Sequence, residues 1–307
     1  MKLSAADPTV RREPVPRPRK VFSPNWLFKR FVPAAPFDDA YGAKGWWTRF
    51  ATAQDLAWKT VSLSPPGWAE RDQNLHIAIL ADLHLGSHTD DCERLIKIVS
   101  KINQRRPDLV LLLGDYVNMQ PFGGGRIPPS VIAAILERLD APLGIHAVLG
   151  NHDYSYGKGR ISGALGQAGI NVMENSASLI ECSKGDFMLY GLADASQGRS
   201  ALPGLLSAQM PGLPGVIMAH DPASFADVPE GPYLTVSGHT HGGQIRLPRF
   251  GALTNSSTAP MHWTSGHIVE GDRHLYVSNG IGTSIMPVRI GCPPEVNFVH
   301  LGAASGL

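Results

Sequence analysis

Residues 75–84 read Leu-His-Ile-Ala-Ile-Leu-Ala-Asp-Leu-His, and this stretch decides the fold. Its first seven residues are apolar apart from His76, and a run of this length and composition is typical of a β-strand buried on both faces. The run ends at Asp82, and His84 follows two positions later. A buried strand that ends in a carboxylate and an imidazole predicts an α/β sheet with a ligand site at its carboxyl edge.

The chain around this strand alternates between strands and helices. A helix is predicted over residues 91–104, because Leu95, Ile98, Val99 and Ile102 recur at helical spacing. The other elements predicted in this half are a helix over 48–59, a short edge strand over 60–63, a strand over 109–113, a helix over 131–139 and a strand over 144–149. Strands separated by helices indicate parallel pairing inside a covered sheet.

The second half of the chain is predicted to contain mainly strands, with few helices between them. The predicted strands cover residues 188–192, 216–219, 234–237, 267–270, 274–278 and 296–301. Residues 270–273, Glu-Gly-Asp-Arg, are typical of a hairpin turn. The fold class that follows is a mixed α/β domain whose second half is rich in sheet.

The composition excludes several classes of protein. Hydrophobic residues make up 43% of the 307 residues, which excludes a fully disordered chain. The 33 Gly and 25 Pro argue against a coiled coil or helical bundle, and no apolar run reaches the ~18 residues of a transmembrane helix. The three cysteines are far apart and form neither a disulfide framework nor a CxxC zinc site, so we expect a reducing compartment.

The N-terminal residues differ from the rest of the chain. Residues 1–38 form a basic, Pro-rich extension, and residues 39–307 are predicted to form a single globular domain. Residues 1–30 hold eight Lys or Arg and two acidic residues, so the remainder of a chain with net charge +1 is mildly acidic. That remainder is therefore not expected to bind nucleic acid over a broad face.

The cluster Trp-Leu-Phe-Lys-Arg-Phe at residues 26–31 has two interpretations. It packs on the domain, or it contacts an anionic membrane surface through its aromatic and basic side chains. No apolar segment of a secretory signal follows the basic residues. We expect a cytoplasmic protein, with peripheral contact to the inner face of the membrane through residues 1–38 as the second interpretation of this cluster.

Clusters of Asp, His and Asn follow five of the predicted strands. They are Asp82-Leu83-His84, Gly114-Asp115, Gly150-Asn151-His152-Asp153, His220-Asp221-Pro222 and Gly238-His239-Thr240-His241-Gly242-Gly243. Because the carboxyl ends of strands in an open α/β sheet face the ligand crevice, we expect these clusters to converge on one site.

The side chains of these clusters favour metal binding. Together they offer carboxylate, amide and imidazole donors and no thiolate, a mixture that suits two divalent ions such as Mn, Fe or Zn, with Mg as a further candidate. Two ions ~3.5–4 Å apart share a carboxylate and polarise one phosphoryl group from two sides. A water molecule between them has a pKa near neutrality and supplies a hydroxide nucleophile.

The five clusters, in this order over residues 82–241, resemble the motifs of the calcineurin-like metallophosphoesterase superfamily. Three later segments resemble its YkuE/YaeI-type bacterial branch, namely Gly242-Gly243-Gln244, Gly282-Thr283-Ser284 and Cys292-Pro293-Pro294-Glu295. The resemblance implies an α/β/β/α sandwich, in which two mixed β-sheets face each other and helices flank them.

The resemblance also implies a role for each site residue. The first metal ion would be held by Asp82, His84 and His241, and the second by Asn151, His220 and His239. Asp115 would bridge both ions. His152 would stay free of metal and protonate or stabilise the leaving oxygen, and Asp153 would orient His152 through a hydrogen bond.

Two of these assignments leave alternatives. Asp153 follows a turn and is also suited to capping a helix. The histidines outside the motifs are expected to be structural or at the surface, with His88 a second candidate for substrate contact because it lies close to the first motif; the others are His76, His146, His262, His267, His274 and His300.

The function that the resemblance implies is that of a binuclear-metal-dependent phosphoesterase, a hydrolase of phosphoric esters. We expect it to cleave a phosphodiester or pyrophosphate bond, of a lipid-linked or nucleotide-sugar substrate, by attack of a metal-bridging hydroxide. The same motifs fit a soluble nucleotide or cyclic-nucleotide phosphodiesterase. A non-catalytic scaffold of the same fold is the third interpretation, which is disfavoured because the chain has His152 as well as every predicted ligand.

Overall fold

The computed structural model describes residues 54–88, 90–119, 125–195, 201–207, 212–285 and 287–303. The predictions for residues 1–38, and for a helix over residues 48–53, lie outside the described residues. Among the helices that the structure describes, none is both long and apolar enough to cross a lipid bilayer.

The first sheet has six strands in the order β1-β14-β2-β3-β4-β5. Their bounds are Ala57–Leu63 for β1, Glu295–Leu301 for β14, Leu75–Leu80 for β2, Leu109–Leu112 for β3, Ile145–Ala147 for β4 and Asn171–Val172 for β5. Strands β2 to β5 are parallel, as the alternation of strands and helices predicts, whereas β14 runs antiparallel to β2. The edge position of β1 confirms the predicted edge strand.

Strand β1 also corrects a prediction. A helix was expected to extend to Lys59, but the strand already begins at Ala57 and pairs along its whole length with β14. The Trp58 ring stacks on Phe298 of β14, with centroids 6.2 Å apart, and Lys101 Nζ of α2 lies over the Trp58 ring, 4.2 Å from its centroid. Pairing and packing with distant residues therefore override the local helical pattern.

The second sheet has the order β12-β13-β9-β8-β7-β6. Its strands are β12 Gly266–Glu270, β13 Arg273–Val277, β9 Tyr233–Ser237, β8 Gly215–Met218, β7 Phe187–Gly191 and β6 Ser176–Ile180. Residues 270–273 form the predicted hairpin turn between β12 and β13. The four inner strands are parallel to their neighbours, and the two edge strands are antiparallel. A small hairpin of β10 Arg246–Leu247 and β11 Gly251–Ala252 follows β9.

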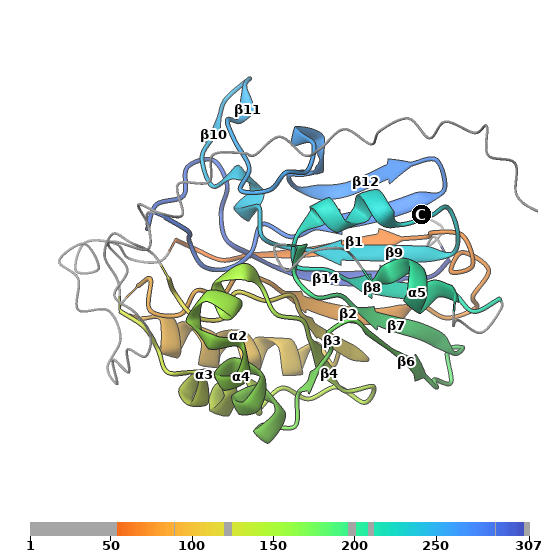
Figure 1. The fold of residues 1–307 in the computed structure, drawn as a ribbon, viewed down its shortest axis with the longest axis horizontal. Coiled ribbons are helices and arrows are strands. Elements are labelled where there is room, and N and C mark those ends of the chain that lie inside the picture. The colour runs from red at the N-terminus through yellow and green to blue at the C-terminus, as the bar shows by residue number, and fades with distance from the viewer. Residues whose placement is uncertain are drawn as a thin grey trace, which may run out of the picture. The chain divides into compact units, whose positions relative to one another are not determined.

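The two sheets pack face to face, with helices on the outer sides (Figure 1). Ile77, Ile79 and Leu111 of the first sheet pack against Val216 and Val236 of the second in one buried cluster. The outer face of the first sheet is covered by α2 Asp91–Gln104, α3 Pro129–Leu136 and α4 Asn151–Gln167, and that of the second by α5 Leu202–Ser207 and the short 3-10 helix η3 Pro222–Asp227. This arrangement is the predicted α/β/β/α sandwich.

Helix α4 has no counterpart among the predicted elements. It contains Gly157, Gly159, Gly163 and Gly166, and each glycine lowers the helical propensity of the segment. Gly157 has a φ of 136° and kinks the helix. The helix is stabilised by its packing on the first sheet, through Tyr156, Ile161 and Leu165, and by its N-terminal contacts, which the next section describes.

Candidate metal centre

The loops after β2, β3, β4, β8 and β9 meet at one edge of the sandwich, where main-chain hydrogen bonds join them. Asp82 N–H donates to the Gly114 carbonyl at 3.0 Å, and His84 N–H donates to the Asp115 carbonyl at 2.9 Å. Gly238 N–H donates to the His220 carbonyl at 3.0 Å. The loops of each sheet are therefore fixed relative to one another by their own backbones.

The backbone in these loops is strained. Ten non-glycine residues among those described have a positive φ, and half of them are predicted metal ligands: Asp82, His84, Asp115, His239 and His241, with φ between 40° and 67°. A left-handed non-glycine residue costs about 1–3 kcal/mol and persists only where the surroundings enforce it. Such clustering is typical of a functional site.

Two glycines let the strand ends approach closely. Gly114 has a φ of 92°, and a Cβ placed there would lie 2.5 Å from the Gly150 nitrogen. A Cβ on Gly238 would lie 2.6 Å from Oδ2 of Asp82. A side chain at Gly114 would push the loop after β3 away from the loop after β4. A side chain at Gly238 would push the loop after β9 away from Asp82.

The first donor group is Asp82, His84 and His241, whose ligand atoms all lie within 4.8 Å of one another. All three side chains are buried, and His241 Nε2 lies 3.7 Å from Oδ1 of Asp82. These are the three residues that the sequence predicts for one metal ion.

The second donor group is Asp115, His220 and His239, which also lie within 4.8 Å of one another. His220 Nε2 is 3.3 Å from Oδ2 of Asp115 and 3.2 Å from Nδ1 of His239. Asn151, the remaining ligand predicted for this ion, has a buried Oδ1 without a hydrogen-bond partner.

Asp115 stands between the two groups. Its Oδ2 atom lies 3.4 Å from His84 Nε2 on one side and 3.3 Å from His220 Nε2 on the other. A third set of donors, His84, Asp115 and His152, lies within the same 4.8 Å limit. One carboxylate thus joins the two groups, in the position expected of a bridging ligand.

The unsatisfied atoms of the site fit a bound cation. Both ring nitrogens of His84 are buried without a hydrogen-bond partner, as is Oδ1 of Asn151. Burying such a group unpaired costs about 1–3 kcal/mol, so native proteins rarely leave one without a function. Carboxylate, amide and imidazole donors aimed at a common centre suit divalent first-row ions.

The pKa values of two predicted ligands, His84 and His241, are consistent with metal binding. Burial, with the nearby His152 charge, lowers the pKa of His84 to about 3, and burial beside His84 holds the pKa of His241 well below its usual range. Both imidazoles are therefore neutral near pH 7, which is the form that binds a metal.

The carboxylate pKa values show what burial does to charge at this site. Burial raises the pKa of Asp82 to about 6. Burial also acts to raise the pKa of Asp115, but His220 and His152 outweigh it and hold that pKa well below its usual range. Buried carboxylates at one site require compensating positive charge.

Hydrogen bonds to the far ring nitrogens orient two of the ligands. His220 Nδ1–H donates to the Leu113 carbonyl at 2.6 Å, and this contact turns Nε2 toward Asp115. His239 Nε2–H donates to the Ser256 carbonyl at 3.0 Å, and this contact turns Nδ1 toward His220 in the second donor group. Partners of this kind fix the tautomer of metal-binding histidines.

Asp153 differs from its predicted role. Its carboxylate accepts hydrogen bonds from three main-chain N–H groups, those of Asp115 at 2.8 Å, Tyr116 at 3.0 Å and Gly150 at 2.9 Å. The expected hydrogen bond to His152 is not made, and the Nδ1 atom of that ring is buried without a partner. The alternative role is the observed one: Asp153 caps helix α4 and ties it to the loop that carries Asp115.

Two histidines named from the sequence have different surroundings. His152 packs edge-on against His84, with centroids 4.7 Å apart, and its Nε2 is 4.0 Å from Oδ2 of Asp115. His88, the second candidate for substrate contact, is buried with Nδ1 3.3 Å from Oδ1 of Asp91. His152 is thus beside the donor groups, whereas His88 lies against the start of α2.

Sequence reasoning missed two charged residues near the donors. Asp194 is buried, and its charge favours the protonated forms of two site histidines. Burial still lowers the pKa of His152, whereas Asp115, with smaller contributions from Asp82 and Asp194, outweighs burial and holds the pKa of His220 well above its usual range. Asp194 follows the strand predicted over 188–192, so the rule applied to the other strand ends would have found it. Arg289 is buried with Nη2 3.2 Å from His241 Nδ1, and no spacing in the sequence points to it.

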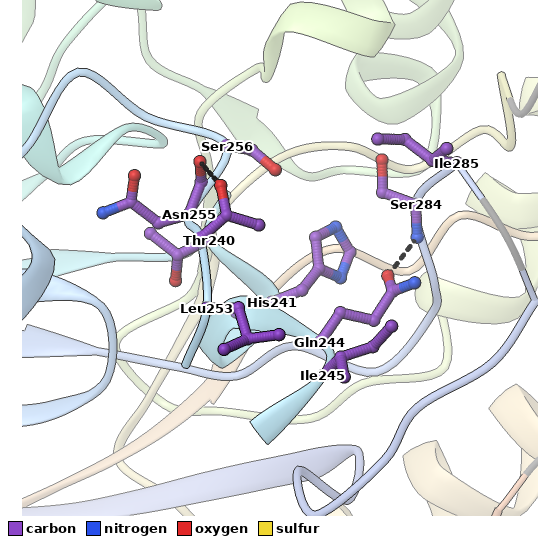
Figure 2. A pocket seen from close by; sticks show the side chains of 11 residues that line it. Thr240, His241, Gln244, Ile245, Leu253, Asn255, Ser256, Ser284 and Ile285 are labelled. Carbon is purple, nitrogen blue, oxygen red and sulfur yellow. Dashed lines mark hydrogen bonds between the residues drawn. The ribbon is translucent and has the colours of Figure 1, made fainter. Parts of the chain in front are cut away.

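A cavity of about 210 Å³ adjoins His241. Figure 2 shows Ile245, Leu253 and Ile285 around this histidine, with the Gln244 side chain accepting a hydrogen bond from Ser284 N–H at 2.8 Å. Among the described residues that line it there is no Phe, Tyr or Trp. Three aliphatic side chains therefore form part of the wall next to the first donor group, together with polar side chains such as Asn255 and Ser256.

Comparison with known proteins gives a consistent result. The family described as calcineurin-like phosphoesterase matches residues 75–243. The chain is 31% identical over 254 residues to phosphodiesterase YaeI of Escherichia coli, across 77% of this chain and 89% of that protein. It is 28% identical over 244 residues to the uncharacterised metallophosphoesterase YkuE of Bacillus subtilis, across 78% and 82%.

Solved structures show weaker likeness. The NAD nucleotidase of Haemophilus influenzae aligns with 68% of this chain and 45% of its own, at a TM-score of 0.46 and 11% identity. The residues that the family matches, 75–243, include all members of both donor groups.

Proposed function

The chain belongs to the calcineurin-like phosphoesterase family and is a hydrolase of phosphoric esters, and from this premise we propose that it uses two divalent metal ions to cleave a phosphodiester or pyrophosphate bond. The observation that carries the proposal is the position of Asp115, whose Oδ2 lies within 3.4 Å of a histidine from each donor group. A single-ion site would need only one of those groups.

The donors divide between two ions. Asp82, His84 and His241 would hold one ion, and Asn151, His220 and His239 the other, with Asp115 shared. Bound ions would polarise the phosphoryl group and provide a hydroxide nucleophile at neutral pH. Mn, Fe, Zn and Mg all accept this set of donors.

His152 is the residue that we assign to proton transfer. Its ring lies next to His84 but is not needed to complete either donor group, and 19% of the side chain is exposed to solvent. It would donate a proton to the leaving oxygen, or stabilise the negative charge there. The main-chain N–H of His152 donates to Oδ1 of Asp115 at 2.9 Å, so this hydrogen bond fixes His152 relative to the shared ligand.

Asp153 is a positioning residue. By accepting hydrogen bonds from Asp115, Tyr116 and Gly150, its carboxylate joins the end of β3 to the start of α4. The two segments that carry Asp115 and His152 are thereby held in register.

The aliphatic cavity beside His241 favours a lipid-linked substrate, such as a nucleotide sugar that carries acyl chains. Ile245, Leu253 and Ile285 provide apolar contact, and the described lining holds no Phe, Tyr or Trp that could stack on a base. YaeI is named a phosphodiesterase, which agrees with a preference for diesters over monoesters. A soluble nucleotide or cyclic-nucleotide phosphodiesterase would need a base-binding surface elsewhere.

The test is a panel of phosphoesters assayed with Mn, Mg, Zn and Fe. It should contain a nitrophenyl monoester, a nitrophenyl diester, a cyclic nucleotide, a nucleotide sugar and a lipid-linked pyrophosphate. We expect metal-dependent hydrolysis that is fastest on the diester or the pyrophosphate. The matched variants are His220→Gln, which removes a buried donor, and His262→Gln, which alters a histidine whose side chain is 64% exposed.

Loss of activity in His220→Gln with normal activity in His262→Gln would support the proposal. Preference for the cyclic nucleotide would favour the soluble phosphodiesterase. If the chain bound metal ions but hydrolysed no member of the panel with any of the four metals, the non-catalytic scaffold would be the better interpretation.

A further inference from the structure

The large apolar side chains exposed at the surface are concentrated near the metal centre. Of the eleven such residues among those described, six lie in two segments, and we call these six the apolar rim: Leu247, Phe250 and Leu253 with Ile285, Val288 and Ile290. Phe250 is 80% exposed and Leu253 is 60% exposed. Single exposed apolar residues are ordinary, but a contiguous group marks an interaction surface.

Main-chain hydrogen bonds place the two segments side by side. Arg246 N–H donates to the Ile290 carbonyl at 2.8 Å, and Ile290 N–H donates to the Gln244 carbonyl at 3.0 Å. The remainder of the first segment is the β10–β11 hairpin, which projects away from both sheets (Figure 1). The rim is therefore one surface. Because the hairpin projects, its side chains can insert into a binding partner without a movement of either sheet.

The charged residues in the two segments of the rim favour an anionic partner. Arg246 and Arg249 lie on the hairpin, and Arg249 is exposed. No Asp or Glu occurs between residues 231 and 269, or between residues 273 and 294. Two segments with exposed apolar side chains and arginine, and with no acidic residue of their own, suit the surface of an anionic lipid bilayer.

The rim is continuous with the cavity beside the metal centre. Leu253 and Ile285 belong to the rim, and they also line the cavity that contains His241 (Figure 2). A lipid surface in contact with the rim would thus lie next to the first donor group.

We propose that the apolar rim docks on an anionic lipid bilayer and that the substrate enters the metal centre from the lipid side. The proposed docking depends only on the exposed side chains of the rim. The proposed route of the substrate depends in addition on the proposed function.

Docking is tested with the full-length protein and vesicles of phosphatidylglycerol, with phosphatidylcholine vesicles for comparison. Phe250→Ser should weaken binding to the anionic vesicles about tenfold, because one large apolar side chain no longer enters the bilayer. Phe250→Leu should restore binding to within about threefold of the parent. Since Phe250 is so exposed, neither change removes packing within the domain, and the melting temperature should stay the same.

Two further variants separate the apolar and electrostatic contributions. Arg249→Gln should lower binding to anionic vesicles about fivefold and leave the weak binding to phosphatidylcholine unchanged. The control is Val269→Ser on β12, which alters an aliphatic side chain that is 52% exposed but lies outside the rim. It should bind as the parent does.

Hydrogen exchange locates the contact. Vesicles should slow exchange of amides in residues 245–254 and 285–290 and leave β12 unaffected. Protection of residues 1–38 alone, with Phe250→Ser binding normally, would overturn the docking proposal. Protection of the rim without vesicles would also overturn it, and its dependence on protein concentration would identify a second copy of the chain as the partner.

The route of the substrate has its own measurement. Phe250→Ser should lower hydrolysis of a diester embedded in vesicles about tenfold and leave hydrolysis of a water-soluble nitrophenyl diester within about twofold. Equal loss on both substrates would overturn this part. Inactivity of the parent on both substrates would count against the proposed function and would leave the vesicle-binding result standing.

Discussion

The two oxygens of Asp115 have different partners. Oδ2 lies between His84 and His220, one from each donor group, whereas Oδ1 accepts the main-chain N–H of His152. The orientation of this carboxylate is thus fixed by a hydrogen bond from the residue that we assign to proton transfer. In the proposed mechanism, metal binding and proton transfer would therefore depend on the same side chain.

Metal content is the first prediction at this scale. The parent protein, purified without chelator, should contain close to two ions per chain. The metal content of Asp115→Asn should fall below one ion per chain, because an amide carries no charge to share between two ions. Asn151→Ala should keep the ion held by Asp82, His84 and His241. Elemental analysis gives the ratio, and a parent that never exceeds one ion under metal-replete conditions would contradict the binuclear site.

The second prediction concerns His152→Ala. The variant should keep both ions, since His152 is not needed to complete either donor group, but its kcat should fall by ~10²–10⁴-fold. The loss should be smaller for a nitrophenyl ester, whose leaving group needs little help from a proton. The measurement is kcat for a series of leaving groups; an equal loss across the series would indicate stabilisation of the phosphoryl group instead.

At the scale of elements, the sequence predicts best where a pattern is local. The strand β2 and the helix α2 agree with their predicted ranges, because apolar runs and helical spacing decide them. The strand β1 was mistaken at its start, since its pairing with β14 joins residues far apart in the chain. The helix α4 was missed because its glycines hide a segment that tertiary contacts stabilise.

The same distinction holds within the candidate site. The donors were predicted because each follows an apolar strand, and the strand ends converge. The contacts of Asp153 could not be predicted in the same way, because they depend on how the loop after β3 packs against the start of α4. Arg289 was not found, since its approach to His241 joins two loops with no shared pattern.

Helix α4 offers a prediction with its own control. Gly157 has a φ of 136°, so Gly157→Ala should destabilise the protein by about 1–3 kcal/mol. Gly163 lies in the same helix, with open space around its Cα, and Gly163→Ala should stabilise by about 0.5–1 kcal/mol. Urea unfolding measures both; equal effects would mean that the kink is not required.

At the scale of the whole molecule, the domain and the N-terminal extension have separate expected roles. The donors all lie between residues 82 and 241, whereas the basic and aromatic residues of the extension lie before residue 39. The chemistry is therefore expected to be independent of the extension.

Deleting residues 1–38 is the prediction that tests this separation. Turnover of a small soluble diester should be nearly unchanged, while binding to anionic vesicles should weaken and become less dependent on salt, because each basic residue near the bilayer contributes about 1 kcal/mol. Vesicle sedimentation and a kinetic assay measure the two effects. A fall in melting temperature, with no vesicle binding by the full-length chain, would instead show that residues 26–31 pack on the domain.

The donor groups draw their residues from both sheets, and the two sheets are already joined there by His239 N–H, which donates to the Asp82 carboxylate at 3.0 Å. An ion bound by both Asp82 and His241 would cross-link two residues that are about 160 positions apart, and such a cross-link lowers the conformational entropy of the unfolded chain. A permanent cross-link over about 100 residues removes on the order of 4–5 kcal/mol of entropy from the unfolded state. The described cysteines, Cys92, Cys182 and Cys292, form no disulfide. A bound ion is thus the reversible counterpart of a disulfide in this chain, and chelators should loosen the sandwich much as reducing agents loosen a secreted domain.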